Sequence, residues 1–248
     1  MADGTHEPIV FVVDDDAEML QAMNLMLGSA GLRVEAFKSA EEFLAIRVPR
    51  DVPRCLLLDL RMRGLSGLGL QQRLAEEHVT IPVIFLTGFG DVPTAVDAIH
   101  RGAIDFLEKP VRRETLLKGV ERALDMDAQS LILEKQATAI EERIDMLSRR
   151  EREVCQLLLE GKSNKEIGAA LAIGLPTVTK HRSRVLQKLR ARNVLELISL
   201  VSSCRAVRAV HEPTSRRAAA GSTEDSRRRL FIDATVDRAG MHFARPAS

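Results

Sequence analysis

Polar side chains that could carry out chemistry stand directly after short apolar runs of this 248-residue chain. Asp14 and Asp15 follow the first run, Asp59 ends the third, and Thr87 and Lys109 follow the last two. Carboxylates crowded together repel one another unless a cation lies between them, and a hard divalent ion such as Mg²⁺ prefers oxygen ligands. A hydroxyl and an ammonium group suit the oxygens of a phosphoryl group. The combination points to metal-assisted phosphoryl transfer onto a carboxylate.

This chemistry requires a fold that brings the residues together. Apolar runs typical of buried strands alternate with segments of helical spacing, which predicts a five-stranded parallel, doubly wound (flavodoxin-like) α/β domain over residues 7–125. The carboxyl ends of such strands meet at one edge of the sheet, where ligands bind. Taken alone, Asp59 could instead cap its strand or the following turn. Strands are expected at residues 9–13, 33–37, 55–60, 82–86 and 104–107, and helices near residues 20–28, 41–46, 70–74, 92–100 and from about 113.

The charge of the chain is distributed unevenly. The net charge is +1, yet residues 1–125 carry −6, residues 126–146 carry −3 and residues 147–248 carry +10. A basic rear half indicates a polyanionic partner, although a basic surface that meets only solvent is the alternative. No signal pattern opens the chain and no apolar run could span a membrane, so we expect a cytoplasmic protein without a membrane partner. The three cysteines lack metal spacing and are expected to be reduced and structural.

Residues 126–146 are expected to form a helical linker. No Gly or Pro occurs between Leu124 and Gly161, and apolar residues recur with heptad spacing. This seam could pair two chains as a coiled coil, or the helix could pack against the domains of its own chain. In both cases the linker is semi-rigid. The seam residues are Leu133, Ala137, Ile140, Ile144 and Leu147.

Residues 147–204 have the pattern of a small all-α domain. Ser148 with Glu151, and Ser163 with Glu166, have the spacing of capping boxes that start two helices. A third helix, with Pro176 in its first turn, is apolar on one face and polar or basic on the other, which is typical of a helix-turn-helix. Its apolar residues are Val178, Val185 and Leu189, and its polar residues are Thr179, Lys180, Ser183, Arg184 and Gln187. Residues 205–248 are expected to be a disordered basic tail.

Residues 7–125 resemble the receiver domain of two-component response regulators, in particular the FixJ branch. The matching motifs are Val13-Asp14-Asp15-Asp16, Asp59-Leu60-Arg61-Met62, Thr87-Gly88 and Glu108-Lys109-Pro110, and residues 88–93 and 102–106 are similar to that branch. The resemblance implies that Asp59 is the phosphoacceptor. It also implies that Mg²⁺ binds Asp14, Asp15, Asp59 and the backbone carbonyl of Arg61, and that Thr87 and Lys109 bind the phosphoryl oxygens.

The same resemblance assigns Thr87 and Phe106 to a conformational switch and makes the Lys109–Pro110 bond cis. Phe106 could instead be a plain core aromatic residue. One position departs from the family, because Arg63 stands where the family usually has proline. Loss of that proline should loosen the loop and could alter donor docking or the lifetime of the phosphoryl group, but it removes no group needed for the chemistry.

Residues 147–204 resemble the LuxR-type DNA-binding domain found at the end of the same branch of regulators. The matching pieces are residues 147–154, 161–167 and 177–189, with Gly174 in place of the usual serine cap. The resemblance implies that residues 177–188 enter the major groove. Base edges would be read by Lys180, Thr179, Ser183 and Gln187, and phosphates would be bound by Arg182, Arg184, Lys188 and Lys165. His181 is expected to be a packing residue and not a metal ligand, because no partner has ligand spacing.

Together the two halves predict a DNA-binding response regulator and not an enzyme. A sensor histidine kinase would phosphorylate Asp59, and the new charge would draw in Thr87 and Lys109, with Phe106 following. The receiver domain would then favour dimers or release the DNA-binding domain. A homodimer would place two recognition helices on promoter half-sites and act with RNA polymerase. A metal-dependent phosphohydrolase and a phosphate sink that never touches DNA are the alternatives. Arg61 and the short loops argue against a hydrolase, which usually needs a second carboxylate and a lid. The basic rear half argues against a sink.

Overall fold

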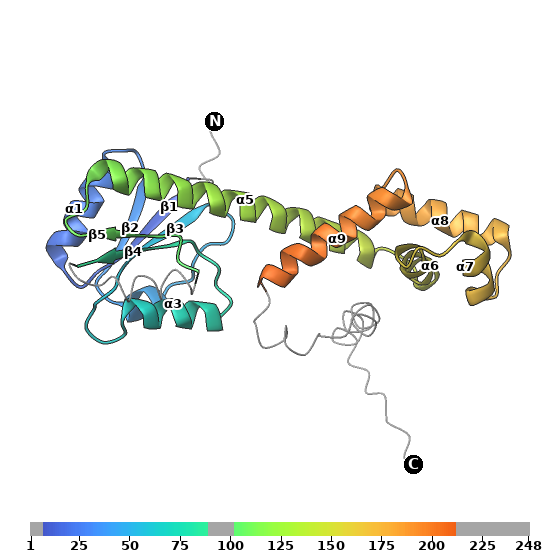
Figure 1. Ribbon diagram of the computed structural model, residues 1–248, viewed down its shortest axis with the longest axis horizontal. Coiled ribbons are helices and arrows are strands. Elements are labelled where there is room, and N and C mark those ends of the chain that lie inside the picture. The colour runs from blue at the N-terminus through green and yellow to red at the C-terminus, as the bar shows by residue number, and fades with distance from the viewer. Residues whose placement is uncertain (1–6, 89–101, 212–248) are drawn as a thin grey trace, which may run out of the picture. The chain divides into compact units, whose positions relative to one another are not determined.

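The computed structural model describes residues 7–88 and 102–211, with the backbone alone for residues 205–211. Five parallel strands form one sheet in the order β2-β1-β3-β4-β5 (Figure 1), so the predicted doubly wound fold is confirmed. Three strands differ from the prediction by one residue at each end; β3 begins at Arg54 because that residue pairs with Ile9 of β1. The strands are β1 Ile9–Val13, β2 Arg33–Phe37, β3 Arg54–Asp59, β4 Val83–Thr87 and β5 Asp105–Glu108.

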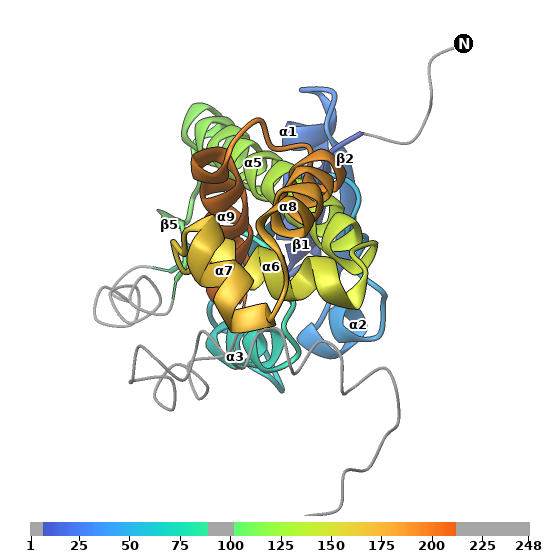
Figure 2. The same ribbon diagram turned by 90° about the vertical axis from the view of Figure 1, so that its right-hand side faces the viewer.

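Helices cover both faces of the sheet. Successive residues of a strand point to opposite faces, and each face has its own cluster of buried apolar residues. Val10 and Val12 of β1 pack with α1 and α5, whereas Phe11 and Val13 pack with α2 and α3. Figure 1 shows α1 and α5 on one side of the sheet and α3 on the other, and Figure 2 shows α2 beside α3. The helix expected at residues 92–100 lies outside the described residues. The helices are α1 Ala17–Gly28, α2 Ala40–Leu44, α3 Gly67–Glu76 and α5 Arg113–Asp145.

Side-chain caps keep the connections at the carboxyl edge of the sheet short. The carboxylate of Asp16 accepts hydrogen bonds from the backbone N–H groups of Glu18 and Met19 at 2.9 and 3.4 Å, which starts α1 directly after β1. Ser66 caps α3 in the same way, by accepting from the N–H of Gly69. Asp14 and Asp15 therefore lie in the short, capped turn between β1 and α1, and Asp59 ends β3 directly before the loop that leads to α3.

Helix α5 runs from residue 113 to 145 without a break, so the last helix of the α/β domain and the expected linker are one element. No structural break marks the expected boundary between residues 125 and 126. A buried ion pair ties this helix to the start of β3: Nε and Nη2 of Arg54 donate to the carboxylate of Asp127 at 3.0 and 3.2 Å. Both side chains are only 4% exposed. The pair therefore anchors α5 to the amino end of the sheet.

The apolar seam of α5 packs against helix α9, Val194–His211. Ala137 and Ile140 of α5 form a buried cluster with Cys204 of α9, to which Ile144 and Leu200 contribute. This part of the seam therefore packs within its own chain, which was one of the two alternatives. Leu133, at the start of the seam, is 49% exposed. Because no Gly or Pro interrupts residues 194–211, α9 continues past residue 204. The first residues of the segment expected to be a disordered tail are therefore helical.

Three further helices build the core of the C-terminal domain. They are α6 Arg149–Leu159, α7 Asn164–Leu171 and α8 Leu175–Leu189. Both predicted capping boxes are confirmed, at Ser148 with Glu151 and at Ser163 with Glu166. The core contains Val154, Leu158, Ile167, Val178, Val185 and Leu189, together with Leu197 and Val201 of α9.

Cys55, Cys155 and Cys204 are buried and form no disulfide bond, as expected for structural cysteines. Burial raises the pKa of the Cys155 thiol to about 12, so this thiol stays protonated and unreactive at neutral pH. Among the residues that the structure describes, no helix combines the length and the apolar character needed to cross a membrane.

Candidate functional sites

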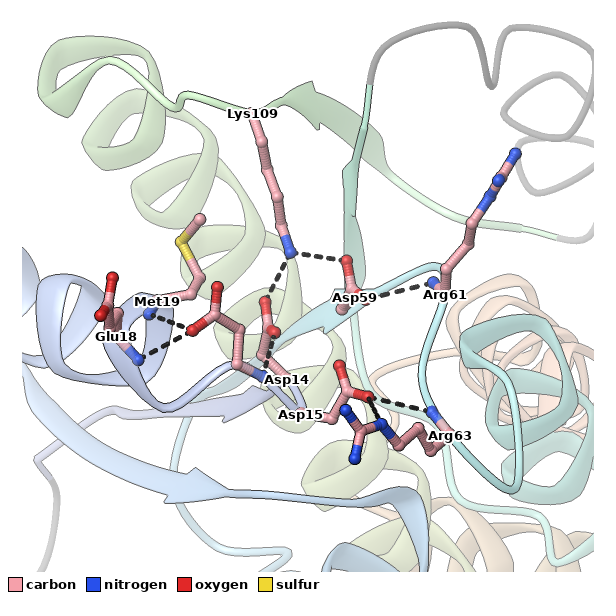
Figure 3. A network of polar contacts seen from close by, with 9 residues as sticks. Asp14, Asp15, Glu18, Met19, Asp59, Arg61, Arg63 and Lys109 are labelled. Carbon is pink, nitrogen blue, oxygen red and sulfur yellow. Dashed lines mark hydrogen bonds and ion pairs between the residues drawn. The ribbon is translucent and has the colours of Figure 1, made fainter.

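The carboxyl ends of β1, β3 and β5 bring three predicted site residues into direct contact. Nζ of Lys109 donates a hydrogen bond to Oδ2 of Asp14 and another to Oδ1 of Asp59, each at 2.7 Å (Figure 3). Both carboxylates are buried and the lysine is partly buried. The sequence expectation that these residues meet at one edge of the sheet is confirmed.

The second oxygen of each buried carboxylate is held by a backbone N–H group. Oδ1 of Asp14 accepts from the N–H of Asp16 at 2.9 Å, and Oδ2 of Asp59 accepts from the N–H of Arg61 at 3.2 Å. Neither carboxylate is therefore free to rotate without losing a hydrogen bond. Asp59 therefore contacts the turn after its strand through one carboxylate oxygen and Lys109 through the other, so its role is not limited to capping the strand.

One ammonium group serves two buried carboxylates, and the pKa values reflect this. Burial raises the pKa of Asp59, and the neighbouring Asp14 carboxylate adds to the rise against the opposing effect of Lys109. Burial alone would lower the pKa of Lys109, but its hydrogen bonds to Asp14 and Asp59 outweigh burial and raise the pKa. Lys109 is therefore a firmly protonated cation, and the pair of carboxylates can still accept further positive charge.

Asp14, Asp15 and Asp59 form a cluster that suits a hard divalent cation. Each can offer one carboxylate oxygen such that the three oxygens lie within 4.8 Å of one another. Asp14 and Asp59 are buried, whereas Asp15 is exposed, so the cluster opens toward solvent on one side. Carboxylate oxygens and solvent access are what Mg²⁺ requires, because this ion keeps several of its water molecules. The donor set therefore fits the expected metal.

The remaining receiver residues lie next to this cluster in the sheet. Thr87 is buried at the end of β4, directly after Leu86, which pairs with Asp59. Its carbonyl oxygen accepts a hydrogen bond from the backbone N–H of Lys109 at 2.8 Å. The Lys109–Pro110 bond is cis, as the family resemblance implied. Phe106 of β5 is 38% exposed, so it is not a plain core residue.

Two residues near Asp59 have roles that the sequence did not reveal. Arg63 was expected to loosen its loop and to affect donor docking or the lifetime of the phosphoryl group, but no contact was predicted for it. Its backbone N–H donates to Oδ2 of Asp15 at 3.2 Å, and its Nε lies 3.7 Å from the same oxygen (Figure 3). At Gly67, a Cβ atom would lie 2.3 Å from the backbone carbonyl oxygen of Asp59. No local pattern could identify the contact with Asp15, because the two residues are 48 positions apart.

Helices α7 and α8 form the expected helix-turn-helix. The turn between them is tight, because Ala172 adopts a left-handed conformation (φ 51°) and a Cβ atom at Gly168 would lie 3.0 Å from the carbonyl oxygen of Ile173. Gly174 is the N-cap of α8, without a side-chain hydrogen bond. The buried face of α8 consists of Val178, Val185 and Leu189, and Thr179, Lys180, Ser183, Arg184 and Gln187 are exposed along it, as is Lys165 on α7.

Two residues that were expected to bind DNA phosphates, Lys188 and Arg182, form hydrogen bonds inside the domain. Nζ of Lys188 donates to Oε2 of the buried Glu151 at 2.7 Å and to the carbonyl oxygen of Met146 at 3.1 Å. The hydrogen bond from Lys188 lowers the pKa of Glu151 to about 2. Nη1 of Arg182 donates to Oδ1 of Asn164 at 2.9 Å. These two side chains fix the orientation of α8 against α6 and α7. His181 is half-buried on the flank of α8.

Comparison with known proteins gives the family of both domains. Residues 10–121 match the response regulator receiver domain, and residues 145–201 match the luxR family of bacterial regulatory proteins. Nodulation protein W of Bradyrhizobium diazoefficiens is 41% identical over 192 residues, which cover 77% of this chain and 84% of that protein. Transcriptional regulatory protein FixJ of the same species is 38% identical over 191 residues, which cover 77% of this chain and 93% of that protein.

The solved structures include a relative that matches most of this chain. The structure of response regulator StyR has a TM-score of 0.69 and 39% sequence identity, and the match covers 79% of this chain and 98% of that chain. Both domains of the chain are therefore matched in sequence, and their combination is matched in structure. The chain belongs to the FixJ/NarL type of two-component response regulators, which are DNA-binding regulators of transcription and not a class of enzymes.

Proposed function

We propose that Asp59 accepts the phosphoryl group in this regulator, and that a sensor histidine kinase donates it. The contact that carries this proposal is the shared ammonium group of Lys109, which lies 2.7 Å from both Asp59 and Asp14. An Oδ atom of Asp59 forms the new bond to phosphorus as the bond between phosphorus and the donor imidazole nitrogen breaks, and that nitrogen takes up a proton. Lys109 neutralises charge on the phosphoryl oxygens, and Thr87 donates a hydrogen bond to one of them.

Asp14, Asp15, Asp59 and the backbone carbonyl of Arg61 would hold Mg²⁺ at this site. When bound, the ion supplies positive charge that offsets the charge of the phosphoryl group. The cluster of three carboxylate oxygens within 4.8 Å supports this assignment, because the like charges of the carboxylates repel one another and a bound cation offsets that repulsion.

The switch follows from the same contacts. A phosphoryl group on Asp59 adds negative charge and acceptor oxygens beside Thr87 and Lys109. These two side chains turn toward it, and Phe106, exposed on β5, follows inward. The changed surface of the receiver domain favours a homodimer, which presents two recognition helices to promoter half-sites. The regulator acts in the cytoplasm, where it meets promoter DNA and RNA polymerase.

Helix α8 is the recognition helix in this proposal. Its exposed side chains Lys180, Thr179, Ser183 and Gln187 read base edges, and Arg184 with Lys165 binds phosphates. Arg182 and Lys188 share the basic surface, but their hydrogen bonds to Asn164 and Glu151 give them the additional task of holding α8 in place.

The test compares wild-type protein with Asp59→Asn in the presence of Mg²⁺ and a small-molecule phosphodonor such as acetyl phosphate. Sedimentation should show dimers of the wild type that the variant does not form, and gel shifts on genomic fragments should tighten only for the wild type. Asp51→Asn, a change at an exposed aspartate outside the site, is the matched control. A variant that dimerises and binds DNA as tightly as the wild type would overturn the proposal.

Two further assays separate the other classes of function. Multiple turnover on phosphate esters would indicate a phosphohydrolase with Asp59 as its nucleophile. A phosphorylated protein with no salt-dependent affinity for DNA would indicate a phosphate sink, because phosphate contacts make DNA affinity fall steeply with salt.

A further inference from the structure

Arg63 makes a contact that a proline at its position could not make. It lies in the loop after β3, and its backbone N–H donates to Oδ2 of Asp15 at 3.2 Å. Its guanidinium reaches the same oxygen, with Nε at 3.7 Å. Figure 3 shows the guanidinium beside the Asp15 carboxylate. Proline has neither an N–H group nor a charge, so both interactions depend on the residue that this chain has in place of the family's usual one.

The carboxylate that Arg63 contacts is the Asp15 member of the cluster described above. Lys109 pairs with Asp14 and Asp59 at 2.7 Å each, and Arg63 pairs with Asp15, the third member. Each carboxylate of the cluster therefore has a cationic partner supplied by the chain. A divalent cation that binds Asp15 therefore meets a carboxylate whose negative charge is already partly offset by the guanidinium and by the N–H group.

The exposure of Arg63 makes this effect weak and reversible. Its side chain is 98% exposed, so its departure from Asp15 removes no packing. Ion pairs of this kind are weak and are screened by salt. The guanidinium is therefore suited to modulate the affinity of the site and not to block it.

We propose that Arg63 is a competing cation at the acidic cluster, which lowers the affinity of the unphosphorylated protein for Mg²⁺. The inference rests on the proposed function, since it assumes that Asp14, Asp15 and Asp59 hold the ion. It gives this regulator a higher Mg²⁺ requirement for phosphorylation than the same chain would have with proline at residue 63.

The test is a calorimetric titration of the full-length protein with MgCl₂ at low ionic strength, without phosphodonor. Arg63→Gln removes the charge and keeps the backbone N–H, Arg63→Pro removes both, and Arg63→Lys keeps the charge. The Gln variant should bind Mg²⁺ roughly two- to fivefold more tightly than the wild type, and the Pro variant at least as tightly as the Gln variant. The Lys variant should stay close to the wild type.

The control is Arg73→Gln, which removes the same charge from an exposed arginine paired with Glu77 outside the cluster. It should leave the affinity unchanged, and raising the salt concentration should shrink the difference between wild type and Arg63→Gln. Equal affinities of wild type and Arg63→Gln would overturn the inference, as would an equal gain in Arg73→Gln. A wild-type protein and variants that all fail to bind Mg²⁺ would instead overturn the metal site of the proposed function.

Discussion

The buried ion pair between Arg54 and Asp127 predicts a large cost when one partner is removed alone. In Asp127→Asn the guanidinium keeps hydrogen bonds to the carbonyl oxygens of Pro49 and Thr80, at 2.8 and 3.1 Å, but loses its counter-charge. Leaving a buried charge unpaired costs about 3–5 kcal/mol, and the two carbonyl acceptors place the expected loss near the lower end. A loss of this size is a large part of the stability of an ordinary domain.

The complementary change, Arg54→Met, leaves the carboxylate of Asp127 with one hydrogen-bond donor among the residues that the structure describes, the backbone N–H of residue 54 at 2.8 Å. The expected loss is about 4 kcal/mol. The double variant Arg54→Met/Asp127→Leu has no buried charge left at this position, but the buried backbone N–H of residue 54 loses its acceptor. Its loss of stability should therefore be about 1–3 kcal/mol, well below the sum of the two single losses. The two single changes should therefore be strongly non-additive.

Hydrogen exchange followed by mass spectrometry is the appropriate assay, because it measures the opening free energy of each domain separately. Peptides that cover β1 and β3 report on the sheet that the ion pair supports. Glu35→Gln, which breaks the exposed pair between Arg33 and Glu35, is the control and should cost less than about 1 kcal/mol. Additive single changes, or single losses no larger than that of the control, would refute the reasoning.

Three further predictions concern the receiver turn and the DNA-binding domain. Gly67→Ala should destabilise the receiver domain by about 1–3 kcal/mol, because its Cβ would lie 2.3 Å from the carbonyl oxygen of Asp59. Thermal unfolding measures this loss. Gly28→Ala is the control and should show no such loss, since its Cβ would meet nothing within 4 Å. Glu151→Gln should cost up to about 3 kcal/mol at pH 7. Since the folded pKa of Glu151, about 2, lies below the usual 4.5, this stabilisation is present above pH ~5 and is lost as the pH falls toward 2; urea unfolding of wild type and variant across that range should converge at the acid end. Arg184→Ala should reduce the slope of log DNA affinity against log salt concentration by about 1. Lys188→Ala should chiefly lower the unfolding temperature of the DNA-binding domain. An unchanged slope in the Arg184 variant would contradict its phosphate contact.

Residues at strand ends were predictable from the sequence because their positions follow from a local pattern. A parallel sheet brings the ends of its strands to one edge, so the meeting of Asp14, Asp59 and Lys109 follows once the strands are recognised. The capping boxes at Ser148 and Ser163 were equally local, since each spans four residues. Alternation of apolar runs and helical spacing was enough for the fold class.

Contacts between distant charged residues were not predictable in this way. Arg54 and Asp127 are 73 positions apart, and Lys188 and Glu151 are 37 apart. Their pairing depends on how elements pack, which a single sequence does not encode in any periodicity. The same holds for Arg63, for which the sequence suggested a looser loop and altered docking or phosphoryl lifetime, but not the contact with Asp15. The helical character of residues 113–145 was predicted, but the boundary placed between residues 125 and 126 has no break in α5, because a continuous helical pattern does not show where a domain ends.

The role of Asp59 as phosphoacceptor is tested most directly by locating the phosphoryl group itself. The full-length protein is incubated with acetyl phosphate and Mg²⁺, the acyl phosphate is trapped by reduction with borohydride, and the modified residue is identified by mass spectrometry of its peptides. We predict modification at Asp59, dependent on Mg²⁺ and absent from Asp59→Asn. Modification at another carboxylate of the wild type, or equal labelling of Asp59 after chelation of the metal, would contradict the proposed site.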